Sequence, residues 1–81
     1  MRIIIVGCGK VGSTITEQLV KEGHDVAVID RDSDVIQDIT NNFDVMGVVG
    51  NGASYSIQKE AGIEDAHLLI AVTGSDEQNL L

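Results

Sequence analysis

The residues best suited to binding chemistry form a glycine-rich segment near the N-terminus. Gly7-Cys8-Gly9-Lys10-Val11-Gly12 follows the pattern G-x-G-x-x-G, directly after an apolar run at residues 3–6. In such a segment Gly7 allows a tight turn, Gly9 lets the backbone approach a pyrophosphate, and Gly12 lets a helix pack closely on a sheet. The N–H groups at the start of that helix then face the phosphates. The segment therefore predicts a phosphate-binding turn between a strand and a helix.

An acidic residue at the end of the next apolar run extends this prediction to a nucleotide. Asp30 lies 18 residues beyond Gly12, where a carboxylate accepts hydrogen bonds from ribose hydroxyls. Its charge repels a 2′-phosphate, which favours NAD(H) over NADP(H). The neighbouring Arg31 can stack on adenine or contact a phosphate, although a solvated arginine is the more ordinary interpretation.

Other chemistries find less support in the residues. A kinase-type phosphate loop, G-x-x-x-x-G-K-[ST], requires a lysine where this chain has Ser13. His24-Asp25 has no further metal ligands at useful spacing, so no metal site is predicted. Cys8 at a helix start is a candidate redox sensor, but a small residue that fits the turn is the simpler interpretation. With no nucleophile, base and acid in a plausible arrangement, we expect no catalytic residues and no enzyme activity.

The segments that must position these residues alternate between strand and helix patterns. Buried β-branched runs predict strands, and apolar residues three or four apart predict helices. Strands are expected at residues 3–6, 25–30, 45–49 and 68–72, and a first helix at residues 11–22. A second helix is expected to carry an apolar stripe at positions 35, 36, 39 and 43, and a short third helix carries apolar residues at 57 and 61 and stops at Gly62. Asp32 or Ser33 and Ser54 are the expected N-caps of the second and third helices. This alternation predicts an α/β fold, a Rossmann-like doubly wound parallel sheet truncated after about four strands.

Length and charge limit the classes of partner. The 81 residues form at most one domain. Another helix is expected to begin at Ser75, and it includes the apolar Leu80 and Leu81. We therefore expect residues 1–81 to be the N-terminal part of a longer domain. The net charge of −8, with 13 Asp and Glu against 5 Lys and Arg, argues against a nucleic-acid partner. A phosphate ligand must then be held locally by backbone N–H groups.

Five segments together give the chain a resemblance to a known family. They are residues 1–12, 28–30, 50–54, 60–66 and 69–79, of which the last, Leu69-Ile70-Ala71-Val72-Thr73-Gly74-Ser75-Asp76-Glu77-Gln78-Asn79, is the most specific. The chain resembles, over essentially its whole length, the RCK or KTN family, the N-terminal nucleotide-binding domains of TrkA-type regulators of potassium uptake.

The resemblance implies a function, a ligand and a set of site residues. It implies a regulatory subunit, cytoplasmic and peripheral at the inner face of the plasma membrane, that binds NAD(H) or ATP/ADP. It also implies a homo-oligomer that controls an integral-membrane potassium transporter of the Trk or Ktr type. The implied cofactor-binding residues are Gly7, Cys8, Gly9, Lys10, Val11, Gly12, Asp30, Arg31, Asn51, Gly52, Ala53, Thr73 and Gly74. Asn51 departs from the family, in which many members have Asp, so the implied contact at this position is one of the backbone or of the side-chain amide.

Two alternative functions remain open from the sequence. One is the cofactor-binding half of an NAD-dependent oxidoreductase, which needs a substrate domain elsewhere in the protein. The other is a dimerisation scaffold with an empty cleft, because fold alone does not establish function. The segment 73–79 and the lack of a catalytic set favour the regulatory domain over both.

Overall fold

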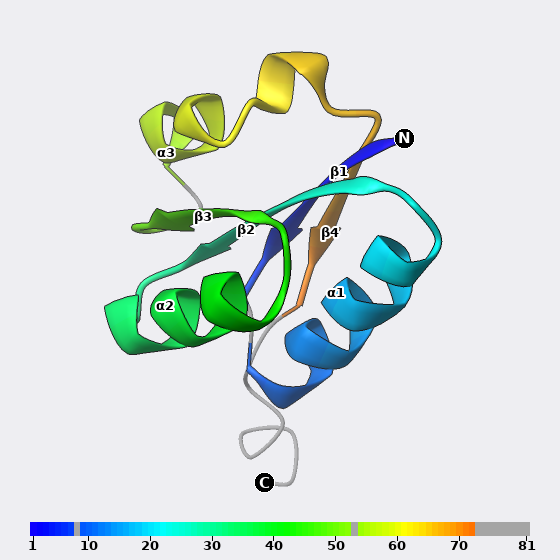
Figure 1. Ribbon diagram of the computed structural model, residues 1–81. Coiled ribbons are helices and arrows are strands. Elements are labelled where there is room, and N and C mark those ends of the chain that lie inside the picture. The colour runs from blue at the N-terminus through cyan, green and yellow to red at the C-terminus, as the bar shows by residue number, and fades with distance from the viewer. Residues whose placement is uncertain (8, 53, 73–81) are drawn as a thin grey trace, which may run out of the picture.

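The protein folds as a parallel sheet with helices on both faces (Figure 1). A computed structural model describes residues 1–7, 9–52 and 54–72. Its strands are β1 (Arg2–Val6), β2 (Asp25–Asp30), β3 (Met46–Val49) and β4 (Leu68–Ala71), and its helices are α1 (Lys10–Lys21), α2 (Ser33–Asn42), α3 (Tyr55–Glu60) and the short 3-10 helix η1 (Ile63–Asp65). The expected alternation is confirmed over this part of the chain. The helix expected to begin at Ser75 lies outside the described residues.

Strand order explains how the sheet is built. The four described strands run in the order β3-β2-β1-β4, and all the pairings are parallel. Strand β1 lies between β2 and β4, with Ile4 opposite Ala27 on one side and Leu69 on the other. A strand that lies between two others, in a sheet with helices on both faces, is buried on both sides and is built mostly of apolar residues. The run of isoleucines in β1 meets that demand.

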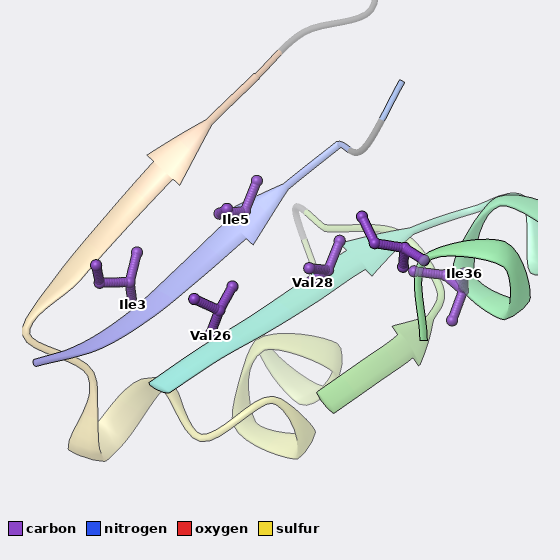
Figure 2. Close-up of a cluster of buried hydrophobic side chains, with 6 residues drawn as sticks. Ile3, Ile5, Val26, Val28 and Ile36 are labelled. Atoms are coloured by element: carbon purple, nitrogen blue, oxygen red, sulfur yellow. The ribbon is translucent and has the colours of Figure 1, made fainter. Parts of the chain in front are cut away.

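The core consists of two apolar layers, one on each face of the sheet. On one face, Ile3 and Ile5 of β1 and Val26 and Val28 of β2 lie side by side and meet Ile36 of α2 (Figure 2). Ile15 and Leu19 of α1 pack on the same cluster. On the other face, Ile4, Ala27 and Ile29 meet Ala61, together with Ile57 of α3 and Ile63 of η1. Alternate residues of a strand point to opposite faces, so one buried run supplies both layers.

The caps show which of the sequence alternatives the chain uses. Asp32 is the N-cap of α2, and its carboxylate accepts a hydrogen bond from the N–H of Asp34. Ser54 stands at the N-cap position of α3, but its hydroxyl makes no capping bond and lies 3.0 Å from the Ser56 hydroxyl. The expected side-chain cap at Ser54 is therefore wrong, whereas one of the two alternatives for α2 is confirmed.

Candidate functional site

The candidate site lies at the edge of the sheet where the four strands end. Because the strands are parallel, the connections that follow them gather at their carboxyl ends. The chain leaves β1 toward β2 on one side, while β4 lies on the other side of β1. Such a reversal of strand order opens a crevice at the carboxyl ends, where α/β proteins bind ligands. The turn after β1 lies at this point.

Gly7 begins that turn in a backbone conformation that favours glycine. Its φ is 89°, and its N–H donates to the carbonyl of Ile29 at 2.7 Å. A Cβ at this position would collide with the backbone carbonyl of Val72. The N–H of Val72 in turn donates to the Val6 carbonyl at 2.7 Å. The turn is thus held against the ends of both β2 and β4.

The helix start beyond the turn is open toward solvent. Gly9 is the N-cap of α1 and makes no side-chain capping bond, and a Cβ added to it would meet no atom of the described residues within 4 Å beyond its chain neighbours. No acidic residue stands in the first turn of α1. Both facts leave the partial positive charge of the helix end for a ligand. Exposed Lys10 and half-exposed Val11 flank it.

Gly12 faces the opposite way, into the fold. It is buried, and its carbonyl accepts a hydrogen bond from the hydroxyl of Thr16 at 2.7 Å. Thr16 is itself fully buried, and this bond satisfies its hydroxyl as a donor. Gly12 and Thr16 thus form the buried side of α1 at this point. Cys8, between Gly7 and Gly9 of the motif, lies outside the described residues.

Asp30 stands beside the turn with its carboxylate oriented by the backbone. It ends β2 and is half-buried, and its Oδ1 accepts a hydrogen bond from the N–H of Asp32 at 2.9 Å. The carbonyl of Asp30 accepts from the N–H of Gly50, also at 2.9 Å. Arg31 is exposed. An oriented carboxylate one strand away from a helix N-terminus suits a ribose whose phosphates lie on the turn.

The loop after β3 completes the described part of the site. Asn51 is exposed, and its carbonyl accepts from the N–H of Ser54 at 2.9 Å. Gly52 lies so close to the end of β1 that a Cβ there would collide with the side chain of Val6. The structure thus brings Gly52, Asp30 and the Gly7 turn to one edge. Ala53, Thr73 and Gly74 fall outside the described residues.

Sequence reasoning missed one contact in this loop. The side-chain amide of Gln58 in α3 donates to the Gly52 carbonyl at 2.7 Å, and the bond is partly buried. Tyr55, near the start of the same helix, is 61% exposed. Its ring lies beneath the Lys59 ammonium, and its hydroxyl reaches toward Glu64 of η1.

Two other kinds of site find no support in the described part of the chain. Over residues 1–7, 9–52 and 54–72, no group of three or more His, Cys, Asp or Glu side chains is placed to hold a metal ion. Within the same residues, no helix is long and apolar enough to cross a membrane.

Comparison with known proteins establishes the family. The family model for the TrkA-N domain matches residues 3–81. The chain belongs to the TrkA-N domain family. Among curated relatives, Trk system potassium uptake protein TrkA of Halomonas elongata is 42% identical over 81 residues, all of this chain and 18% of that protein. The protein of the same name from Streptomyces coelicolor is 41% identical, over 36% of its length. This TrkA-N domain chain thus spans less than half the length of these two curated relatives.

Solved structures agree with the fold. The TrkA-N domain of the inner membrane protein ybaL from Escherichia coli superposes with a TM-score of 0.82 at 28% identity, over 95% of this chain and 57% of that chain. A structure described as the Shewanella denitrificans Kef CTD in AMP bound form gives a TM-score of 0.79 at 22% identity, over 99% of this chain and 47% of that one. The second likeness concerns the fold alone. The Rossmann-like parallel sheet expected from the sequence is confirmed.

Proposed function

We propose that this chain is a regulatory nucleotide-binding domain that takes NAD(H) or ATP/ADP at the carboxyl ends of its strands. In this proposal the phosphates meet the backbone of residues 7–12 and the adenosine ribose meets Asp30. Arg31, residues 51–53 and residues 73–74 line the rest of the cleft. The domain performs no chemistry on its ligand and acts through the protein that carries it.

The observation that carries the proposal is the open N-terminus of α1 behind the glycine turn. Among the described residues, no atom beyond its chain neighbours would lie within 4 Å of a Cβ at Gly9, which makes no side-chain capping bond, and the first turn of α1 holds no acid. With a net charge of −8, the chain repels anions at long range, so a phosphate needs such a local site of N–H groups. The same local site explains why an acidic protein can bind a nucleotide.

Asp30 supplies the selectivity of the proposed site. Its carboxylate is oriented by the Asp32 N–H at 2.9 Å, so no ordering of that side chain is needed when ribose binds. A 2′-phosphate placed there would meet this charge at short range. NAD(H), ATP and ADP are therefore the proposed ligands, and NADP(H) is disfavoured.

The parent protein supplies the rest of the function. The curated relatives are named potassium uptake proteins of the Trk system, and this supports a role in potassium transport for the protein that carries the chain. We place residues 1–81 as the N-terminal part of a single domain in that protein. The proposed protein is a cytoplasmic homo-oligomer at the inner face of the plasma membrane, where it contacts a transporter subunit.

The experiment is a calorimetric titration of the full chain with NAD, NADH, NADP, ATP and ADP, with the variant Gly9→Val as control. A Val side chain at the open position would occupy the place of the pyrophosphate. We expect saturable binding of NAD(H) or ATP/ADP that the variant loses while its circular dichroism is unchanged. No binding of any nucleotide, or equal binding by the variant, contradicts the proposal. Hydride transfer to an added substrate would instead support an oxidoreductase.

A further inference from the structure

The side-chain hydrogen bond of Gln58 differs in burial and in partner from those of several other amide side chains. Several described side-chain bonds, such as Gln18 to Glu22 and Asn42 to Asp38, are exposed and stay within one helix or at its end. The Gln58 amide is half-buried and reaches back from α3 to the Gly52 carbonyl, at 2.7 Å. It therefore joins a helix to the loop that precedes it.

That loop crosses the edge of the sheet that holds the candidate site. At its start, the N–H of Gly50 donates to the carbonyl of Asp30 at the end of β2. Two residues later, Gly52 lies against Val6, the last residue of β1 and the neighbour of Gly7. The loop thus runs from the proposed ribose contact toward the proposed phosphate turn.

The side chain of Gln58 adds a bond to α3 to the backbone bonds of this loop. The bond from the Ser54 N–H to the Asn51 carbonyl closes a turn within the loop but ties it to no strand. Glycines at positions 50 and 52 add conformational freedom that must be removed on folding. A half-buried carbonyl needs a partner in place of water. Gln58 supplies that partner at Gly52.

We propose that Gln58 is a positioning residue for the nucleotide. Its amide holds the Gly52 carbonyl, and through it the loop that starts beside Asp30 at the end of β2, where the proposed nucleoside lies. The inference rests on the proposed function. Gln58 touches no ligand and acts only through the loop.

The consequence is a selective loss of affinity. Without the bond, the loop must be ordered when a nucleotide binds, so affinity for ADP and NADH falls by about 3- to 10-fold, the usual worth of one such hydrogen bond. Inorganic pyrophosphate reaches only the glycine turn, and its affinity stays the same. If Gln58 served only the fold, its replacement would lower the stability of the whole chain and would change the affinities for nucleotide and for pyrophosphate alike.

The test uses the full chain with Gln58→Met, Gln58→Glu and the matched control Gln18→Met. Methionine keeps the length of the side chain and removes the donor, and glutamate keeps the shape but only accepts at neutral pH. Gln18→Met also loses an amide hydrogen bond, which Gln18 makes to Glu22 on the exposed side of α1 at its C-terminal end. Calorimetry gives the ADP and NADH affinities, NMR titration gives the pyrophosphate affinity, and the carbonyl carbon shift of Gly52 reports the bond itself.

The expected result is weaker ADP and NADH binding in both Gln58 variants, a changed Gly52 carbonyl shift, unchanged pyrophosphate binding, and normal behaviour of Gln18→Met. Equal nucleotide affinity in Gln58→Met and the unmutated chain overturns the inference, as does an unchanged Gly52 shift. If both Gln58 variants unfold, the residue serves the fold and the inference is wrong. If the unmutated chain binds no nucleotide, the proposed function fails first, and the Gly52 shift still tells whether Gln58 holds the loop.

Discussion

The substitution Gly7→Ala tests whether the turn is shaped by contact with β4 as well as by backbone conformation. Gly7 has φ 89°, and a Cβ there would collide with the Val72 carbonyl. Gly23, at the end of α1, has nearly the same φ of 87°, and beyond its chain neighbours no atom of the described residues lies within 4 Å of an added Cβ. The two glycines therefore share the conformational cost of alanine, and only Gly7 adds the collision.

Alanine is expected to lower the free energy of unfolding by different amounts at these two positions. A left-handed conformation costs alanine about 1–2 kcal/mol, and the lower entropy of the unfolded alanine chain returns about 0.4–1 kcal/mol. Gly23→Ala should therefore lower the free energy of unfolding by about 1 kcal/mol. At Gly7 the obstacle is backbone, which no rotamer change can avoid, so overpacking adds about 1–3 kcal/mol. A domain of this size has roughly 4–12 kcal/mol in total, so Gly7→Ala removes a large part of it.

Urea unfolding of the full chain, followed by circular dichroism and extrapolated to water, measures both values. We expect Gly7→Ala to be less stable than Gly23→Ala by at least about 1 kcal/mol. Equal stabilities of the two variants would show that the end of β4 does not press on the turn, and would refute the described contact between Gly7 and Val72.

Three further predictions concern the acidic residues and the open sheet edges. Asp30→Ala should narrow the preference for NAD(H) over NADP(H) in calorimetry, because it removes the charge that repels a 2′-phosphate; an unchanged ratio would assign the selectivity to another residue. Asp32→Ala should lower the free energy of unfolding by about 1 kcal/mol, since the capping bond to the Asp34 N–H is lost; unchanged urea stability would contradict the cap. The 81-residue chain should self-associate in light scattering, with a nucleotide coupling of about 1–3 kcal/mol, because both described edge strands of this chain expose apolar side chains such as Met46 and Leu68; a monomer insensitive to every nucleotide would rule this out.

Much of the fold could be predicted because it depends on local patterns. The isoleucine run of β1 and the four-residue spacing of Ile15 and Leu19 are visible in the sequence, and the structure places them as expected. The alternation of strands and helices was enough to predict a parallel sheet. Strand bounds shifted by only a residue, as for β3, which begins at Met46 in place of residue 45.

The tertiary contacts of the site could not be predicted in the same way. That Gly52 must be small depends on the side chain of Val6, which lies far away in the sequence. The Ser54 hydroxyl had a plausible local use as a cap, but it lies against Ser56. The Gln58 amide bonds to the Gly52 carbonyl six residues earlier, a spacing with no helical signature. Such contacts depend on the path of the loop in three dimensions, which no periodic pattern in the sequence indicates.

The most direct test of the central claim is an NMR titration of the full chain with ADP, in which amide shifts are mapped on the structure. The proposed site predicts that the largest changes fall on Gly9, Gly12 and the residues around Asp30, at the carboxyl ends of the strands. The amides of Gly23 and Gly62, which follow α1 and α3, should move little. Changes concentrated at those two glycines, or no change at saturating ADP, would contradict nucleotide binding at the glycine turn.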